Sequence, residues 1–458
     1  MSMFELHKNI FQLGVFVRKM KKVALHNLGC KVNSYETQAM QQMMEEAGYE
    51  IVNFGKEPSD ICIINTCSVT NMADRKSRQM IHKARKLNPD AIIVATGCYV
   101  ESAKEYVDED VDIIIGNNEK SHLLDILNSY FQEEWDNSLE DMGKVRDFDE
   151  MKLTKPEEHT RAYVKIQDGC NRFCSYCIIP YVRGRIRSRE KEEIVKEITA
   201  IAESGCKEVV LTGIHLSSYG MDKTDSNVML IDIIEIIDKI DGIERIRLGS
   251  LEPLVVTEDF VKRLSACKKV CPHFHLSLQS GCDTVLKRMN RRYNVDEFYT
   301  GVELLRKYYD RPAITTDVIV GFPQETDEEF EDTVKYLEKV CFYELHVFKY
   351  SRRKGTVADK MPGQIPENIK DIRSDRLLAL DDNLSREYRE KYIGSKVLVL
   401  FEEKVTMDGK EYILGFTDTY VKVAVECNEE TNLEPNDIVS IRITGLIGKD
   451  MVIGVAEN

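Results

Sequence analysis

Short apolar segments alternate with amphipathic helical patterns along most of this 458-residue chain. Such alternation predicts parallel strands joined by crossover helices, and therefore an α/β fold. The pattern occurs in two separate series, which indicates more than one domain. In the first series, helical patterns at residues 35–47 and 75–87 predict a doubly wound parallel sheet. We expect its strands at residues 23–28, 61–65, 91–95 and 111–115.

The second series contains six strand-and-helix units, which predict a partial (β/α)6 barrel rather than a closed eightfold barrel. We expect its strands at residues 162–166, 209–211, 246–248, 274–278, 313–320 and 345–348. Helical patterns separate them at residues 194–203, 230–240, 258–266, 296–308 and 327–339. A further helical segment, at about residues 367–392, closes this region.

The C-terminal part has short β-branched segments separated by Gly, Asn and Asp, which predict a small β-barrel. Its strands are expected at residues 397–401, 412–416, 421–425, 438–444 and 451–455. An acidic, strand-poor stretch between the two α/β series predicts a linker. The expected organisation is an N-terminal extension (1–19), a first α/β domain (20–143), a linker (144–157), a barrel domain (158–388) and a C-terminal β-barrel (389–458).

The composition indicates a cytoplasmic protein that binds metal. No apolar run is long enough to span a membrane, and the apolar stretch at residues 11–17 is too short for a secretory signal. Thirteen cysteines in such a chain favour metal ligation over disulfides. The net charge of −15 excludes a generally basic surface, so any RNA contact must come from local basic patches.

Three closely spaced cysteines, Cys170, Cys174 and Cys177, follow the first strand of the second series. Three thiolates can hold three irons of a [4Fe–4S] cluster and leave the fourth iron without a protein ligand. An open iron can chelate S-adenosylmethionine (SAM), whose cleavage by one electron gives a 5′-deoxyadenosyl radical. The alternative is a zinc site, but zinc takes four ligands and no fourth ligand is evident nearby.

Around this loop the chain resembles the radical SAM superfamily. Polar or glycine residues follow successive strands of the predicted barrel, at the end where barrel active sites are built. These residues are Gly213, Ser250, Gln279, Asp317 and Tyr350. The resemblance implies that Tyr176 lies near the adenine of SAM. We expect the SAM contacts to come from Tyr176, Gly213, Ser250, Glu252, Gln279 and Asp317.

Three dispersed cysteines, Cys30, Cys67 and Cys98, each follow a predicted strand of the first sheet. Ligand sites in open α/β sheets lie outside the carboxyl ends of the strands, so these thiols should converge there. They could hold a second [4Fe–4S] cluster. Three unrelated buried cysteines are the alternative, but that would not explain their equivalent positions.

With both cysteine sets considered, the chain resembles the methylthiotransferases, a family with an N-terminal three-cysteine domain, a radical SAM domain and a C-terminal TRAM domain. Further matching stretches lie at residues 211–215, 277–281, 289–293, 316–323 and 350–356. His215 stands where Asn is expected in many members. The segment from Leu28 to Asn33, followed by Glu36 and Thr37, is most similar to the branch that acts on N6-threonylcarbamoyladenosine beside the tRNA anticodon.

The resemblance implies that a radical formed at the Cys170 set removes the hydrogen from C2 of the adenine. The second cluster then provides a methylated sulfur. It also implies a tRNA anticodon stem-loop as partner and a low-potential electron donor such as flavodoxin or ferredoxin. Sister branches act on isopentenyladenosine in tRNA or on an aspartate of a ribosomal protein. An alternative of another class is a non-catalytic RNA-binding protein that holds zinc.

Two basic runs lie beside the two cysteine sets and predict contacts with RNA phosphates, although a solvated face is the usual meaning of such a run. The first comprises Arg75, Lys76, Arg78, Lys83, Arg85 and Lys86, and the second Arg183, Arg185, Arg187 and Arg189. Another group resembles a zinc site but is expected to be structural, because its histidines share a strand face. Its members are Cys267, Cys271, His273 and His275.

Overall fold

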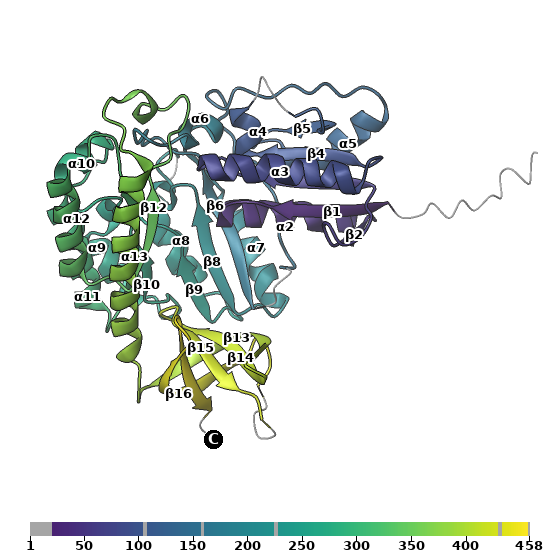
Figure 1. Ribbon diagram of the computed structural model, residues 1–458. Helices are drawn as coiled ribbons and strands as arrows, with labels where there is room; N and C mark the ends of the chain where they lie inside the picture. Colours follow the sequence, from purple (N-terminus) through teal and green to yellow (C-terminus); the bar gives the residue numbers. More distant parts are fainter. Residues whose placement is uncertain (1–20, 104–107, 157–159, 224–227, 429–432, 457–458) are drawn as a thin grey trace, which may run out of the picture.

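A computed structural model describes residues 21–103, 108–156, 160–223, 228–428 and 433–456. Two α/β parts lie side by side, and a small β-barrel lies below them (Figure 1). The predicted extension at residues 1–19 lies outside the described residues. No helix within the described ranges has the length and apolarity needed to cross a membrane.

The first part is a parallel five-stranded sheet with helices on both faces, as the alternation predicted. Its strand order is β2 (Glu50–Val52), β1 (Lys22–Asn27), β3 (Ile61–Thr66), β4 (Ile92–Gly97) and β5 (Ile113–Ile115). The connecting helices are α2 (Lys31–Glu46), α3 (Asn71–Leu87), α4 (Cys98–Ser102), the 3-10 helix η1 (Lys120–His122) and α5 (Leu123–Phe131). Alternate residues of β3 enter different cores, Ile61 and Ile63 on one face and Cys62 and Ile64 on the other. Both faces are therefore covered.

The second part has six parallel strands and one short antiparallel strand. They are β6 (Arg161–Asp168), β7 (Arg187–Ser188), β8 (Glu208–Gly213), β9 (Arg245–Leu248), β10 (His273–His275), β11 (Ala313–Val320) and β12 (Glu344–Lys349). They form two sheets, β7-β6-β8-β9 and β10-β11-β12. Isolated parallel bridges, Ile246 to Val270 and Leu251 to Leu276, connect the sheets, so the strands continue around one curved wall.

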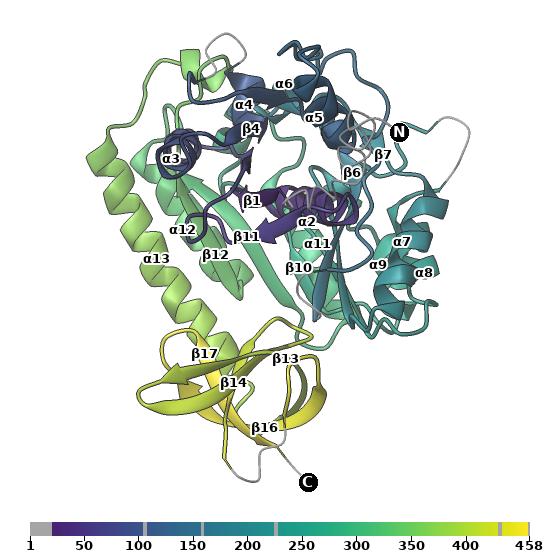
Figure 2. The ribbon, with the colours of Figure 1, turned by 90° about the vertical axis from the view of Figure 1, so that its right-hand side faces the viewer.

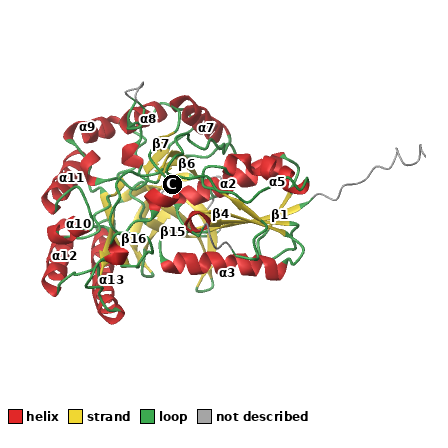
Figure 3. Cartoon of the chain, turned by 90° about the horizontal axis from the view of Figure 1, so that it is seen from above, coloured by secondary structure: helices red, strands yellow, loops and turns green. Residues whose placement is uncertain are grey.

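Helices lie along the outer side of this wall (Figure 3). They are α7 (Lys191–Glu203), α8 (Leu230–Ile237), α9 (Glu258–Ala266), α10 (Asp283–Arg288), α11 (Val295–Tyr308), α12 (Asp327–Val340) and α13 (Glu367–Glu390). The short helix α6 (Ile179–Val182) instead packs beside α4 of the first part. The 3-10 turns of the second part are η2 (Leu216–Ser218), η3 (Pro253–Val255) and η4 (Ala358–Lys360). Capping boxes start two of the helices, Asn294 with Glu297 for α11 and Thr326 with Glu329 for α12. Each box satisfies backbone N–H groups that have no partner within the helix.

The C-terminal part is a closed five-stranded barrel. Its strands are β13 (Lys396–Met407), β14 (Lys410–Thr417), β15 (Lys422–Glu426), β16 (Ile438–Ile447) and β17 (Met451–Ala456). Arginines at the start of β9 hold it against the second part: Arg245 donates to the carbonyls of Phe416 and Leu398, both at 2.8 Å, and Arg247 donates to that of Asp418 at 3.0 Å. The barrel therefore covers the amino ends of these strands (Figure 2).

The segment predicted as a linker contains no helix or strand among its described residues, 144–156. It is nevertheless packed, because Met151 and Leu153 are buried in the core of the first part. The carbonyl of Met151 accepts hydrogen bonds from Tyr35 Oη at 2.7 Å and from Arg189 Nη2 at 3.1 Å. This segment therefore connects the two α/β parts through side chains as well as through the chain.

Candidate active site

The three dispersed cysteines lie together at the carboxyl ends of adjacent strands. Cys30 is the N-cap of α2, Cys67 follows β3, and Cys98 begins α4 directly after β4. Gly29, with φ +109°, lies so close to Cys67 that a Cβ there would be 2.9 Å from its Sγ atom. The predicted convergence of these thiols results from the common edge that parallel strands share.

Burial and the neighbouring thiols both affect protonation in this set. Burial, followed by the charge of Cys98, raises the pKa of Cys67 to about 11. Burial also raises the pKa of Cys98, against the opposing effect of Arg183. Cys67 and Cys98 are therefore protonated at neutral pH unless a cationic ligand binds them.

The loop that carries Cys170, Cys174 and Cys177 is clamped by the segment after α6. Cys170 N donates to the carbonyl of Gly184 at 3.0 Å. A Cβ at Gly169, where φ is +69°, would lie 1.8 Å from the carbonyl oxygen of Arg185. Burial, followed by the Cys174 thiol, raises the pKa of Cys177 to about 12. Cys177 is therefore protonated at neutral pH in the absence of a metal, as Cys67 is.

In each cysteine set, one arginine donates a hydrogen bond to one sulfur. Arg183 Nε lies 3.4 Å from Cys98 Sγ, and Arg291 Nη1 lies 3.2 Å from Cys174 Sγ. Three thiols, a guanidinium that offsets their negative charge when ionised, and a glycine-lined approach fit an iron–sulfur cluster in both places. Arg291 lies in the stretch at residues 289–293 that matched the family, but sequence reasoning gave it no role.

The two sets are neighbours. Ile178, the residue after Cys177, packs with Ile179 and Val182 against Cys98. Arg183, one residue beyond α6, completes this contact through its bond to Cys98. The short segment 178–183 therefore begins directly after Cys177 of one set and contacts Cys98 of the other.

Glu36 is the centre of a fully buried ionic cluster behind Cys98. Its carboxylate contacts Arg183 Nη1 at 2.7 Å, Lys120 Nζ at 2.6 Å and Lys165 Nζ at 2.8 Å. Asp168 joins the same cluster through Lys165 at 2.7 Å. Burial alone would raise the pKa of Glu36, but the three cations hold it well below its usual value. The cluster connects α2, η1, β6 and the segment after α6.

This cluster corrects one prediction. Arg183 was expected to contact RNA phosphates, but its side chain is wholly buried and paired with Glu36. Arg187 and Arg189 are buried as well, with Arg189 bonded to Glu150. Arg185 alone in this run is partly exposed, with its guanidinium 4.6 Å from the ring centre of Phe173. The second basic run is therefore mainly structural.

The first basic run is mostly exposed. Arg75, Lys76, Arg78, Lys83 and Lys86 are exposed on α3. Arg85 is an exception, because it pairs with Asp112 at 2.6 Å and donates to the carbonyl of Ala91 at 2.8 Å. Helix α3 therefore offers a basic face directly after the Cys67 loop.

The predicted SAM contacts are distributed around the Cys170 loop. Tyr176 packs edge-on against Phe322, with ring centres 6.4 Å apart. Glu252 is buried, pairs with Arg172, and lies 3.3 Å from His215 Nε2. Burial alone would raise the pKa of Glu252, but His215 and Arg172 lower it. Arg172 was not predicted from the sequence.

The remaining predicted SAM contacts have different local environments. Ser250 is exposed, and a Cβ at Gly213 would meet Gln167 Oε1 at 2.9 Å. Gln279 has a positive φ of 72°, and its backbone N–H donates to the carbonyl of Asp317 at 2.8 Å.

The inner face of β10, β11 and β12 carries a polar group that sequence reasoning only partly identified. His275 Nε2 lies 3.4 Å from Asp317 Oδ2, and its ring is stacked on that of His346 with centres 5.4 Å apart. His273, by contrast, packs against Tyr420 of the C-terminal barrel. The two histidines thus make separate contacts.

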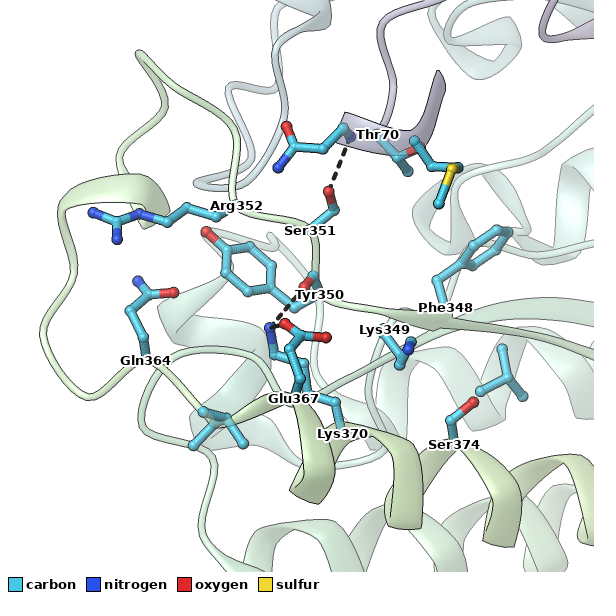
Figure 4. A pocket seen from close by; sticks show the side chains of 14 residues that line it. Thr70, Phe348, Lys349, Tyr350, Ser351, Arg352, Gln364, Glu367, Lys370 and Ser374 are labelled. Atoms are coloured by element: carbon cyan, nitrogen blue, oxygen red, sulfur yellow. Dashed lines mark hydrogen bonds and ion pairs between the residues drawn. The ribbon is translucent and has the colours of Figure 1, made fainter. Parts of the chain in front are cut away.

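A cavity of about 590 Å³ lies between the Cys67 loop, the end of β12 and the start of α13 (Figure 4). Thr70 and Met72 line it from the first part, and Phe348 and Tyr350 line it from β12 and the residue after it. Asn71 N donates to Ser351 Oγ at 3.1 Å across the boundary. Phe348, which lines this cavity, is 48% exposed.

Known protein families match both α/β parts. Residues 164–337 match the Radical SAM superfamily, and residues 22–116 match the uncharacterized protein family UPF0004. A curated relative, the threonylcarbamoyladenosine tRNA methylthiotransferase MtaB of Bacillus subtilis, is 41% identical over 90% of this chain and 92% of its own. The MtaB protein of Thermotoga maritima is 37% identical over 95% and 99%.

Two further matches are more distant. The tRNA-2-methylthio-N(6)-dimethylallyladenosine synthase of Acetivibrio thermocellus is 35% identical over 84% of this chain and 81% of its own. Among solved structures, the radical SAM methyltransferase TsrM of Kitasatospora setae, with cobalamin and a [4Fe-4S] cluster bound, aligns over 85% of this chain and 81% of its own. Its TM-score is 0.55 at 14% identity, so it supports the fold alone.

We expect Gly29→Ala to reduce iron binding by the first cysteine set. The new Cβ would displace Cys67 and would also strain a backbone with positive φ. Iron content and absorbance after anaerobic reconstitution measure the loss. Gly48→Ala is the matched control, because Gly48 has φ +84° with nothing within 4 Å of the new Cβ. Equal iron content in both variants would contradict the steric argument.

We expect Glu36→Gln to lower the free energy of unfolding by about 3–5 kcal/mol at neutral pH, because three buried cations lose their shared anion. Folding lowers the pKa of Glu36, so its contribution is complete above the unfolded value of about 4.3 and is lost only as the pH falls further. Urea denaturation at pH 7 measures the change. The exposed Glu45→Gln on the same helix should stay within about 0.5 kcal/mol of the native protein.

Proposed function

The chain belongs to the tRNA methylthiotransferases, which are radical SAM enzymes, and from this we propose that it converts N6-threonylcarbamoyladenosine in tRNA into its 2-methylthio derivative. Four MtaB relatives, 37–41% identical over most of the chain, support this substrate. The observation that carries the proposal is the contact between Ile178 and Cys98, which joins the two cysteine sets. Insertion of sulfur into an unreactive C–H bond requires a radical source and a sulfur source beside the same base.

SAM and [4Fe–4S] clusters are the cofactors of this family. We assign one cluster and SAM to Cys170, Cys174 and Cys177, and the second cluster to Cys30, Cys67 and Cys98. When bound, the first group supplies the one-electron cleavage of SAM, and the second supplies the sulfur. The fold that we propose for these parts is a partial (β/α)6 barrel at residues 158–388 and an N-terminal cluster domain at residues 20–143.

The protein's own residues orient and neutralise these groups. Arg183 and Arg291 each donate to one cysteine sulfur, which stabilises the thiolate form that a metal requires. Glu252, kept ionised by His215 and Arg172, would attract the ammonium group of SAM. Tyr176, beside Phe322, would provide an aromatic surface for its adenine. Gly213, Ser250, Gln279 and Asp317 complete the SAM contacts in this proposal.

The tRNA partner is proposed to bind through its anticodon stem-loop. The exposed basic face of α3 lies beside the Cys67 loop and supplies the phosphate contacts. The C-terminal barrel, residues 389–458, is proposed to be a TRAM domain that contributes shape and stacking. SAM cleavage consumes an electron, so a cytoplasmic low-potential donor such as flavodoxin or ferredoxin is proposed as the second partner.

Nucleoside mass spectrometry tests the reaction. In cells that lack this protein, we expect 2-methylthio-N6-threonylcarbamoyladenosine to disappear from tRNA and the native gene to restore it. The Cys98→Ala variant should not restore it, but the purified variant should still cleave SAM to 5′-deoxyadenosine, because the Cys170 set is intact. Loss of the dimethylallyl derivative instead would change the substrate and keep the family. Equal loss of both activities in Cys98→Ala would contradict the separate roles of the two sets.

We expect the double variant Arg75→Ala, Lys76→Ala to bind an anticodon stem-loop more weakly. Its affinity should also depend less steeply on salt, by about 1 in the log–log slope for each phosphate that the variant no longer neutralises. Fluorescence anisotropy across a salt series measures both. Lys196→Ala, on the exposed face of α7, serves as the control and should leave the slope unchanged. An unchanged slope in the double variant would exclude α3 from the phosphate contacts.

A further inference from the structure

Like Arg183, Arg353 reaches from the second part of the chain into the first. It lies in the segment that follows β12, where the neighbouring Arg352 is exposed but Arg353 itself is only 6% exposed. Its guanidinium crosses the boundary between the parts: Nη1 contacts Asp74 Oδ2 at 2.6 Å, and Nη2 donates to Ser68 Oγ at 2.7 Å. A buried cation is costly unless it is paired, so the position of this side chain depends on these partners.

The partners of Arg353 belong to the loop that carries Cys67. Ser68 is the next residue, and its hydroxyl donates to Asp74 Oδ1, in the first turn of α3, at 2.7 Å. Three residues further on, Ser77 Oγ accepts from Cys67 N at 3.1 Å and donates to the carbonyl of Cys67 at 3.0 Å. Arg353 therefore holds the start of α3, and α3 holds the backbone of Cys67.

The segment that carries Arg353 also contacts the other cysteine set. The backbone N–H of Ala358, five residues further on, donates to the carbonyl of Ser175 at 2.7 Å. Ser175 lies between Cys174 and Cys177. Ala358 is fully buried in a hydrophobic cluster beside this loop, so the contact does not compete with water.

The chain between these two contacts forms a tight turn. The carbonyl of Arg353 accepts hydrogen bonds from Thr356 Oγ1 at 2.7 Å and from Thr356 N at 3.1 Å. The same hydroxyl accepts from Asp359 N at 3.3 Å. Gly355 has a positive φ of 90°, which favours glycine at this position of the turn. Residues 353–358 therefore connect the Cys67 loop to the Cys174–Cys177 loop through a short, internally bonded segment.

Two arginines of the second part thus hold different members of the first cysteine set. Arg183 donates to Cys98 Sγ at 3.4 Å and to Asn33 Oδ1 at 2.7 Å, in the first turn after Cys30. Arg353 contacts the loop of the remaining cysteine. Each arginine lies a few residues from a contact with the Cys170 loop or from the end of that loop, so both relate one set to the other.

We propose that Arg353 is a positioning residue, which sets the Cys67 loop at the correct distance from the Cys170 set. The inference rests on the proposed function and adds a residue outside both cysteine sets. In that reaction two groups act on one base in succession, and a misplacement of about 1 Å lowers a rate about 100-fold. Loss of Arg353 should therefore leave SAM cleavage intact and reduce the transfer of sulfur to the base.

The Arg353→Gln holoenzyme tests the proposal through two readouts. The first is the amount of 5′-deoxyadenosine formed per methylthio nucleoside, on an anticodon stem-loop that carries threonylcarbamoyladenosine. We expect this ratio to rise about 10- to 100-fold over that of the native enzyme. The second readout is hydrogen exchange without substrate, which should become faster in residues 67–74 and remain native in residues 170–177.

Arg352→Gln is the matched control, because it removes the preceding arginine of the same segment. The Arg352 side chain is 60% exposed, points away from Thr70 (Figure 4), and pairs with Asp359 at 2.6 Å. We expect this variant to keep the native product ratio and the native hydrogen exchange.

Further variants separate positioning from a general loss of stability. Arg353→Lys should recover part of the native ratio, because an ammonium still pairs with Asp74 but lacks the planar guanidinium that also reaches Ser68. Asp74→Asn should reproduce the defect of Arg353→Gln, and the double variant should be no worse than either single variant. If Arg353→Gln does not fold, Asp74→Asn supplies the same two readouts from the other side of the contact.

Three outcomes overturn these claims in different ways. If either the product ratio or the exchange of residues 67–74 stays native in Arg353→Gln, the positioning role is wrong while the proposed function stands. If iron content and SAM cleavage fall together with methylthiolation in Arg353→Gln, Arg353→Lys and Asp74→Asn alike, the contact supports folding alone and the positioning role is again wrong. If the native holoenzyme cleaves SAM but leaves threonylcarbamoyladenosine RNA unmodified, the proposed function itself is wrong.

Discussion

The buried ionic cluster around Glu36 is the interaction on which the active site depends. Its carboxylate and its three cations come from α2, η1, β6 and the segment after α6, so it closes only when both α/β parts are in place. Each ion alone would be costly to bury, and their mutual contacts compensate this cost. The geometry is consequently specific, because a small shift between the parts would leave a charge without a partner.

Arg183 connects the ionic cluster around Glu36 to the sulfur of Cys98. Its contacts with Glu36, Asp168, Asn33 and Cys98 fix its position, and it lies one residue beyond the helix that follows Cys177. The position of one cysteine set is therefore coupled to that of the other. In the proposed function, a base held between the two sets would meet both groups at once, which a reaction with a short-lived radical requires.

The sequence predicted the features that depend on local pattern. The apolar segments indicated the strands, and parallel pairing placed Cys30, Cys67 and Cys98 at one edge. Where a feature depends on contacts between residues far apart in the sequence, the prediction was missing or wrong. Arg183 belongs to a run of charges that is typical of a solvated face, and its partner Glu36 lies in a different domain. The sequence also did not predict the burial of Met151 and Leu153, because two apolar residues in a polar segment show no periodicity.

Charge is distributed unevenly, and this uneven distribution has a chemical consequence. The chain carries a net charge of −15, yet cations are concentrated within it: Lys120, Lys165 and Arg183 near Cys98, and Arg291 near Cys174. Burial raises the pKa values of Cys67 and Cys177, so the thiols resist ionisation until a positive metal centre arrives. Metal loading must therefore release protons, and the buried cations lower the cost of the thiolates that result. In the proposed function, the net negative charge would limit RNA contact to the few places, such as α3, where cations reach the surface.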